Sequence, residues 1–86
     1  MKIGMAGSLE SNDALITVKE SSVINIEVQS IVDAFYHDQI VQVIQSTLDA
    51  ARINAIDVVC LDKGALDYTI KARLLTAIHR MEVRHE

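Results

Sequence analysis

The 86-residue sequence has no proline, no tryptophan, one cysteine and only three aromatic residues. Without proline we expect no rigid linker and no kinked helix. The single cysteine, Cys60, excludes an internal disulfide and fits a reducing compartment. No apolar run approaches the ~20 residues that span a bilayer, and the N-terminal segment has no run typical of a signal peptide. These absences predict a soluble, cytoplasmic protein that does not enter a membrane.

The charge balance is acidic, with a formal net charge of −4. Proteins that bind nucleic acids need a basic face to displace counterions, so the balance argues against a nucleic-acid partner. Half of the residues are apolar, which is enough for a compact core. The length predicts one domain over residues 1–86.

Three strands are predicted in the first third of the chain. Residues 2–7 and 14–20 form the first two, and residues 10–13 give turn chemistry between them. Residues 23–29 alternate cleanly, which is typical of a half-buried antiparallel strand. The apolar positions of this third strand are Ile24, Ile26 and Val28.

A long helix follows, for which Ser30 is the expected N-cap and Asp33 the acid of a capping box. The pattern continues to about residue 53, and Asn54 is a reasonable stop. Its apolar residues recur at helical spacing and form one stripe along the helix. They are Val32, Tyr36, Ile40, Val43, Ile44, Leu48 and Ala51.

The short apolar run at residues 56–61 predicts a strand that is buried on both faces or lies inside the sheet. Residues 62–64 form the turn out of it, where Gly64 is expected to adopt a positive φ. A second helix runs from about residue 66 to Arg84, and His85 and Glu86 should fray. Its apolar positions are Leu66, Ile70, Leu74, Leu75, Ala77, Ile78 and Met81.

The predicted element order is therefore β-β-β-α-β-α. We expect an α+β fold, a two-layer single domain with a mainly antiparallel sheet and two helices packed on one face.

Catalytic machinery is not visible in the sequence. A serine nucleophile needs a base, but His37, His79 and His85 lie on the predicted helices or at the chain end, and no Gly-x-Ser-x-Gly motif occurs. No spacing typical of a metal site or a phosphate-binding loop is present, and Cys60 is expected to be a small buried apolar residue. What remains is Ser11, at an exposed turn between Glu10 and Asp13, where a modifying enzyme can reach it.

Three segments carry a resemblance to a known family: residues 6–13 (AGSLESND), 62–67 (DKGALD) and 71–74 (KARL). In this order and at this separation they resemble the acyl carrier protein, or gamma chain, of citrate lyase. The Asp-Ser-Leu motif of ordinary four-helix carrier proteins is absent. The resemblance covers nearly the whole chain.

The resemblance implies that Ser11 is the attachment site of a 2'-(5''-phosphoribosyl)-3'-dephospho-CoA group, which a prosthetic-group transferase installs through a phosphodiester. Its thiol holds an acetyl or citryl thioester. The alpha subunit of citrate lyase exchanges the acetyl group for citrate, and the beta subunit cleaves the citryl thioester to oxaloacetate. The chain itself is then a non-catalytic carrier subunit with no catalytic residue and no metal.

The acids beside the serine imply an exposed site, since a phosphodiester is tolerated there only in water. We expect Glu10 and Asp13 to serve as a handle for basic residues of the transferase or partner subunits, so neutralising both should slow group transfer, most at low salt. A second candidate docking surface is the exposed face of the second helix, with Lys71, Arg73 and Arg80. The interpretation of these side chains as solvated charges is favoured over a docking role.

Two other functions stay open. The related carrier subunit of malonate decarboxylase uses the same kind of group. A small non-catalytic protein- or RNA-binding module is the alternative from another class, because the same element order occurs there and a fold does not fix a function.

Overall fold

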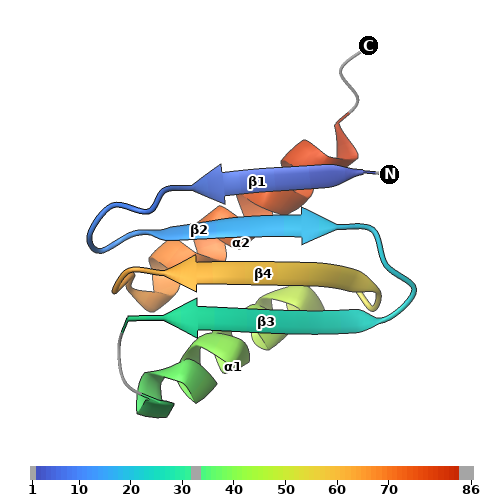
Figure 1. The fold of residues 1–86 in the computed structure, drawn as a ribbon. Coiled ribbons are helices and arrows are strands. Elements are labelled where there is room, and N and C mark those ends of the chain that lie inside the picture. Colours follow the sequence, from blue (N-terminus) through green and yellow to red (C-terminus); the bar gives the residue numbers. More distant parts are fainter. Residues whose placement is uncertain (1, 32–33, 84–86) are drawn as a thin grey trace.

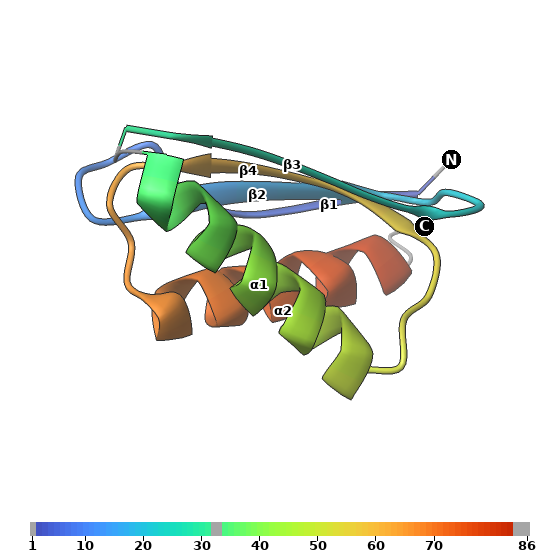
Figure 2. The same cartoon turned by 90° about the horizontal axis from the view of Figure 1, so that it is seen from below.

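The chain folds into a four-stranded sheet with two helices on one of its faces, in a computed structural model that describes residues 2–31 and 34–83 (Figures 1 and 2). The strands are β1 (Ile3–Gly7), β2 (Ala14–Lys19), β3 (Ile24–Ser30) and β4 (Ile56–Asp62), and the helices are α1 (Ala34–Ala50) and α2 (Asp67–Glu82). The predicted order and the two-layer α+β class are confirmed. Neither helix is long and apolar enough to cross a membrane, within the residues described.

The sheet has the order β1-β2-β4-β3. The pairs β1/β2 and β2/β4 are antiparallel, so the prediction of a mainly antiparallel sheet is confirmed. The third strand was expected to be antiparallel, and that is wrong: β3 is an edge strand that pairs with β4 in parallel. The reason is the connection, because α1 crosses the face of the sheet between them, and such a crossover returns the chain in the same direction.

Strand β4 lies inside the sheet, between β2 and β3, which is one of its two predicted placements. Its burial alternates, with Ile56, Val58 and Cys60 buried toward the helices. Asp62 was assigned to the following turn, but it is the last residue of β4 and is buried. The opposite face of the strand stays partly exposed.

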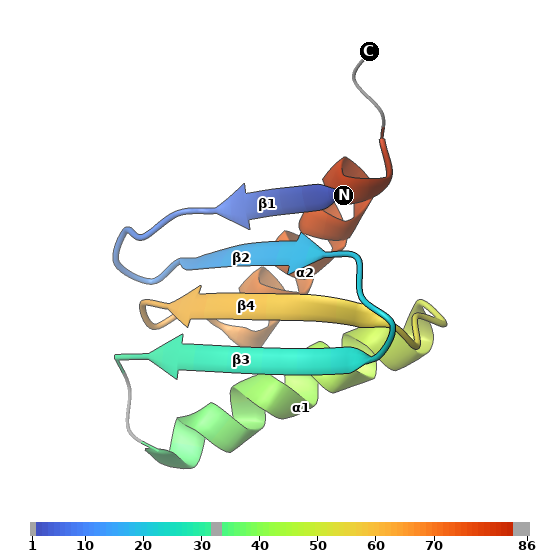
Figure 3. The same ribbon diagram turned by 45° about the vertical axis from the view of Figure 1, so that its right-hand side comes forward.

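The core fills the space between the sheet and the helices. Helix α2 packs on β1 and β2, and α1 packs against β3 (Figure 3). The predicted stripes are confirmed at their centres: Ile40, Ile44 and Leu48 of α1 and Ile70, Leu74, Ala77 and Ile78 of α2 are buried. Other members of the stripes are exposed, because they lie at helix ends or on the outer face: Tyr36, Ala51, Leu66 and Leu75. Val32 lies outside the described residues.

Ser30, the predicted cap of α1, is the last residue of β3, and the described part of α1 begins at Ala34. The Ser30 hydroxyl donates a 2.7 Å hydrogen bond to Oδ2 of Asp62 across the β3/β4 pair. Its role as a helix cap stays a prediction. Asp33, the other half of the expected capping box, lies outside the described residues, as do Arg84, His85 and Glu86 at the chain end.

Helix α1 ends earlier than predicted, at Ala50. Arg52 takes the left-handed conformation, with φ of 60°. The amide of Arg52 bonds to the carbonyl of Asp49, and the amide of Ile53 to that of Leu48. This is the Schellman arrangement, which satisfies the last free carbonyls of a helix. The stop is thus made by Arg52 and not by Asn54.

Candidate attachment site at Ser11

Ser11 lies at the tip of the turn that joins β1 to β2. The amide of Asp13 donates a 3.1 Å hydrogen bond to the carbonyl of Glu10, which closes a four-residue turn. Asn12 has φ of 67°, the conformation that a type II turn requires at its third residue. Asn tolerates this conformation well, so the sequence supports the local geometry. Ser11 is exposed, as the prediction required.

Asp13 fastens the base of this turn to α2. Its Oδ1 accepts hydrogen bonds from the Arg73 Nε (2.9 Å) and from the amide of Ala14 (2.8 Å). Its Oδ2 accepts from the Arg73 Nη2 (3.1 Å) and from the Ser8 hydroxyl (2.7 Å). These donors, Arg73 first, lower the pKa of Asp13 to about 2, and the ion pair raises the pKa of Arg73. Because Arg73 donates to both carboxylate oxygens of Asp13, the pair fixes the relative orientation of the two side chains as well as balancing their charges.

Lys63 fastens the same turn to the end of β4. The amide of Asn12 donates to the Lys63 carbonyl (2.8 Å), and the amide of Lys63 donates to the Asp13 carbonyl (2.9 Å). Gly64, next in the chain, has φ of 94°, so its predicted positive φ is confirmed. Ser11 is therefore displayed on a turn held on both sides by the β4–α2 loop and by α2.

The two acids beside Ser11 differ in their surroundings. Glu10 is exposed, whereas the Asp13 side chain is only 15% exposed and is paired with Arg73. The negative charge of Asp13 is thus matched within the molecule, and Glu10 is the acid that faces solvent. The role of both as a recognition handle stays a prediction.

Arg73 was considered only as part of a docking surface or as a solvated charge, and sequence analysis missed its contact with Asp13. The two residues are 60 positions apart, so no local pattern links them. Of the other cations in that group, Arg80 donates a hydrogen bond to the Met5 carbonyl, and Lys71 is exposed.

The surroundings of Ser11 show no catalytic apparatus in the part of the chain that the structure describes. No histidine is hydrogen-bonded to Ser11; His37 lies beside Asp38 at 3.6 Å on α1, and His79 is in the last turn of α2. No group of three potential metal ligands occurs among the described residues. Cys60 is buried as predicted, and burial raises the pKa of its thiol to about 12.

Comparison with known proteins decides the family. The family model described as "Malonate decarboxylase delta subunit (MdcD)", an acyl carrier protein model, matches residues 1–81. The citrate lyase acyl carrier protein of Streptococcus mutans is 47% identical over 78 residues, which cover 88% of this chain and 76% of that protein. The one of Streptococcus uberis is 44% identical over 81 residues, covering 93% of this chain and 80% of that protein.

The chain belongs to the family of citrate lyase acyl carrier proteins. The family resemblance inferred from residues 6–13, 62–67 and 71–74 is thus confirmed, and the chain is an acyl carrier. A chain in the crystal structure of a Pseudomonas malonate decarboxylase hetero-tetramer in complex with malonate shares the fold, with a TM-score of 0.77, 18% identity, and coverage of 93% of this chain and 84% of that one.

Proposed function

We propose that the chain is the acyl carrier subunit of citrate lyase and that Ser11 carries a covalently attached 2'-(5''-phosphoribosyl)-3'-dephospho-CoA group. The observation that supports this most directly is the exposed hydroxyl of Ser11 on a turn with a fixed base. The two curated relatives described above, at 47% and 44% identity, are both named for citrate lyase.

The residues around Ser11 fit such a group. No hydrogen bond within the described part of the chain occupies the Ser11 hydroxyl, so it is open to a transferase. The phosphodiester that would form there adds a negative charge next to Glu10. Because the site is solvated, a pair of unit charges ~6 Å apart repels by only ~0.7 kcal/mol.

When attached, the group supplies the thiol on which the acyl unit travels, and the chemistry therefore resides in the group. The protein's own residues present and position it. Arg73 and the backbone of Lys63 hold the turn in place, while the thiol end of the attached group reaches the partner subunits. A tether of this kind gives an effective concentration of roughly millimolar order at each active site.

The partners that follow from this proposal are the alpha and beta subunits of citrate lyase and the prosthetic-group transferase. The alpha subunit is the site of acyl exchange, and the beta subunit is the site of cleavage to oxaloacetate. Glu10 is the acid available to a basic surface on the transferase. Its replacement by glutamine should slow transfer most at low salt, because screening removes the attraction at high salt.

The carrier subunit of malonate decarboxylase is the second candidate. The description of the matching family model favours it. The likeness to the solved malonate decarboxylase complex, at 18% identity, supports the shared fold alone.

Reconstitution separates the two. The chain, loaded by its transferase, is combined either with citrate lyase alpha and beta subunits or with the malonate decarboxylase subunits, and oxaloacetate or carbon dioxide is measured. We expect citrate cleavage with the first set only, abolished by Ser11→Ala. Ser22→Ala, at an exposed serine outside the Ser11 turn, is the matched control and should retain activity. Release of carbon dioxide from malonate with the second set only would overturn the assignment.

A further inference from the structure

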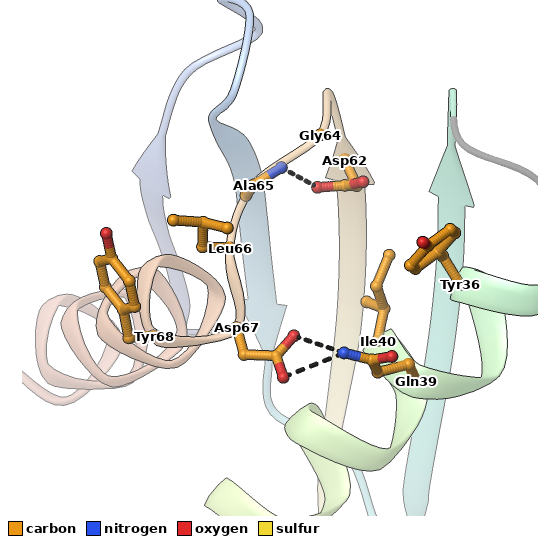
Figure 4. A pocket seen from close by; sticks show the side chains of 9 residues that line it. All are labelled: Tyr36, Gln39, Ile40, Asp62, Gly64, Ala65, Leu66, Asp67 and Tyr68. Carbon is orange, nitrogen blue, oxygen red and sulfur yellow. Dashed lines mark hydrogen bonds between the residues drawn. The ribbon is translucent and has the colours of Figure 1, made fainter.

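A cavity of about 470 Å³ opens between the first turns of α1 and α2 and the β4–α2 loop (Figure 4). Tyr36 and Ile40 of α1 line one side, and Leu66 lies on the other. At one end, the Gln39 amide donates hydrogen bonds of 3.2 and 3.1 Å to the two carboxylate oxygens of Asp67, which join the helices. The volume lies within the range of small-molecule sites.

The cavity adjoins the turn that carries Ser11. Gly64 lines it, and a Cβ placed on Gly64 would lie 3.6 Å from Oδ1 of Asn12, the neighbour of Ser11. The amide of Asn12 is also bonded to the carbonyl of Lys63, the residue before Gly64. A group attached to Ser11 therefore begins close to the mouth of the cavity.

The charged side chains that line the cavity determine which part of an attached nucleotide group it can hold. Within the described part of the chain, the lining holds two carboxylates, Asp62 and Asp67, and no Lys, Arg or His. The oxygens of Asp62 are engaged by the amide of Ala65 and by the Ser30 hydroxyl. A phosphate placed here would face Asp67 without a cation to balance it, which like-charge repulsion disfavours. A neutral planar ring with hydrogen-bond donors meets no such repulsion.

We propose, on the basis of the function proposed above, that this cavity holds the adenosine part of the group attached to Ser11. In 2'-(5''-phosphoribosyl)-3'-dephospho-CoA a single phosphoribosyl unit links the serine oxygen to adenosine, and the pyrophosphate and pantetheine continue from the far side of that adenosine. Seating adenosine leaves both phosphate-bearing segments outside the acidic cavity. The pantetheine arm then moves about a fixed pivot.

The side chains of the cavity suit an adenine ring. A glutamine amide pairs with the edge of adenine in nucleic-acid recognition, and Gln39 offers such an amide once it leaves Asp67. Asp67 accepts hydrogen bonds from an exocyclic amine or a ribose hydroxyl. Tyr36 and the apolar walls offer stacking and contact surface. Because the ring is tethered, even millimolar intrinsic affinity of the cavity suffices to keep it occupied, since the effective concentration is roughly millimolar.

The test compares ¹⁵N-labelled protein before and after loading by the transferase, with the attached group verified by intact mass. We expect amide shifts at residues 39–40 and 64–68 on loading, and nuclear Overhauser contacts from the adenine H2 and H8 protons to methyl groups of Ile40 and Leu66. Gln39→Ala should weaken these contacts with no change in the attached mass. Gln45→Ala is the matched control, since Gln45 lies on the same helix and bonds to Asp49 outside the cavity.

The outcomes separate this inference from the proposed function. Full loading on Ser11 with shifts confined to residues 8–13 and no adenine contacts overturns the inference and leaves the carrier function standing. Adenine contacts that persist unchanged in Gln39→Ala overturn the role of Gln39. A chain from its native host that bears no added mass overturns the proposed function, and the inference with it.

Discussion

Asp13 links three segments that are far apart in the sequence, through its carboxylate and its backbone carbonyl. The carboxylate joins the β1–β2 turn to Arg73 of α2, while the backbone joins the same turn to Lys63 after β4. Ser11 itself makes none of these bonds, which is what allows it to be exposed on a rigid support. At the scale of single residues, the proposed attachment site is thus held in place by the neighbours of Ser11.

The Asp13–Arg73 pair predicts a specific pH dependence of stability. The pKa of Asp13 is lowered from 3.8 to about 2 in the folded protein. The unfolded chain therefore takes up the proton first, and the stabilisation is fully present above about pH 4 and lost as the pH falls toward 2. In urea unfolding between pH 2 and 5, Asp13→Asn should lack this loss. Asp49→Asn, at an exposed acid, should retain it; identical profiles for wild type and Asp13→Asn would contradict the account.

The thiol of Cys60 should be inert in the folded protein. It is fully buried in β4, and burial first, with the nearby charge of Asp62, raises its pKa to about 12. Because the thiolate is the reactive form, a thiol reagent at pH 8 should label unmodified protein only after denaturation. Loaded protein should then show one fast thiol, that of the attached group. Labelling of unmodified native protein at the rate of a free cysteine is the opposing result.

At the scale of secondary-structure elements, the close packing of α2 on β1 depends on Gly4, which has no side chain. A Cβ on Gly4 would meet the carbonyl oxygen of Ala77 and the amide of Met81, both of them backbone atoms that do not yield easily. The same helix carries Arg73, so the depth at which α2 packs also sets the position of the Ser11 turn.

Gly4→Ala should therefore destabilise the protein by about 1–3 kcal/mol, as overpacking of a tight contact does. Met5→Ala is the matched control on the same strand, because its side chain is 48% exposed on the uncovered face and the change should stay within about 0.5 kcal/mol. Denaturant unfolding measures both variants. Equal stabilities would show that α2 does not pack on β1 as described.

The helices and strands were predictable from the sequence where the pattern lies within a single element. The alternation of Ile24, Ile26 and Val28 correctly predicts which face of β3 is buried, since a strand has a period of two. Its partner and direction depend on where α1 returns the chain, which no pattern within residues 24–30 records. Likewise, no local pattern predicts the hydrogen bond from the Ser30 hydroxyl to Asp62, because it joins residues 32 positions apart.

At the scale of the whole molecule, the features on which the proposed function depends lie at one end of the sheet. The Ser11 turn, the end of β4 and the first turns of both helices lie together there (Figure 1). The serine, its turn and its exposure were predictable from the sequence, because Asn12 and the flanking acids carry turn chemistry. The cavity and the Asp13–Arg73 contact were not, since they form only when β4, α1 and α2 meet.

The most direct test is the intact mass of the chain purified from its native host. The account predicts an increment equal to the phosphoribosyl-dephospho-CoA group, absent in Ser11→Ala and retained in Ser22→Ala. Peptide mapping should place it on the peptide containing Ser11. An unmodified mass for the wild-type chain, or an increment that survives Ser11→Ala, would contradict the claim that this hydroxyl is the point of attachment.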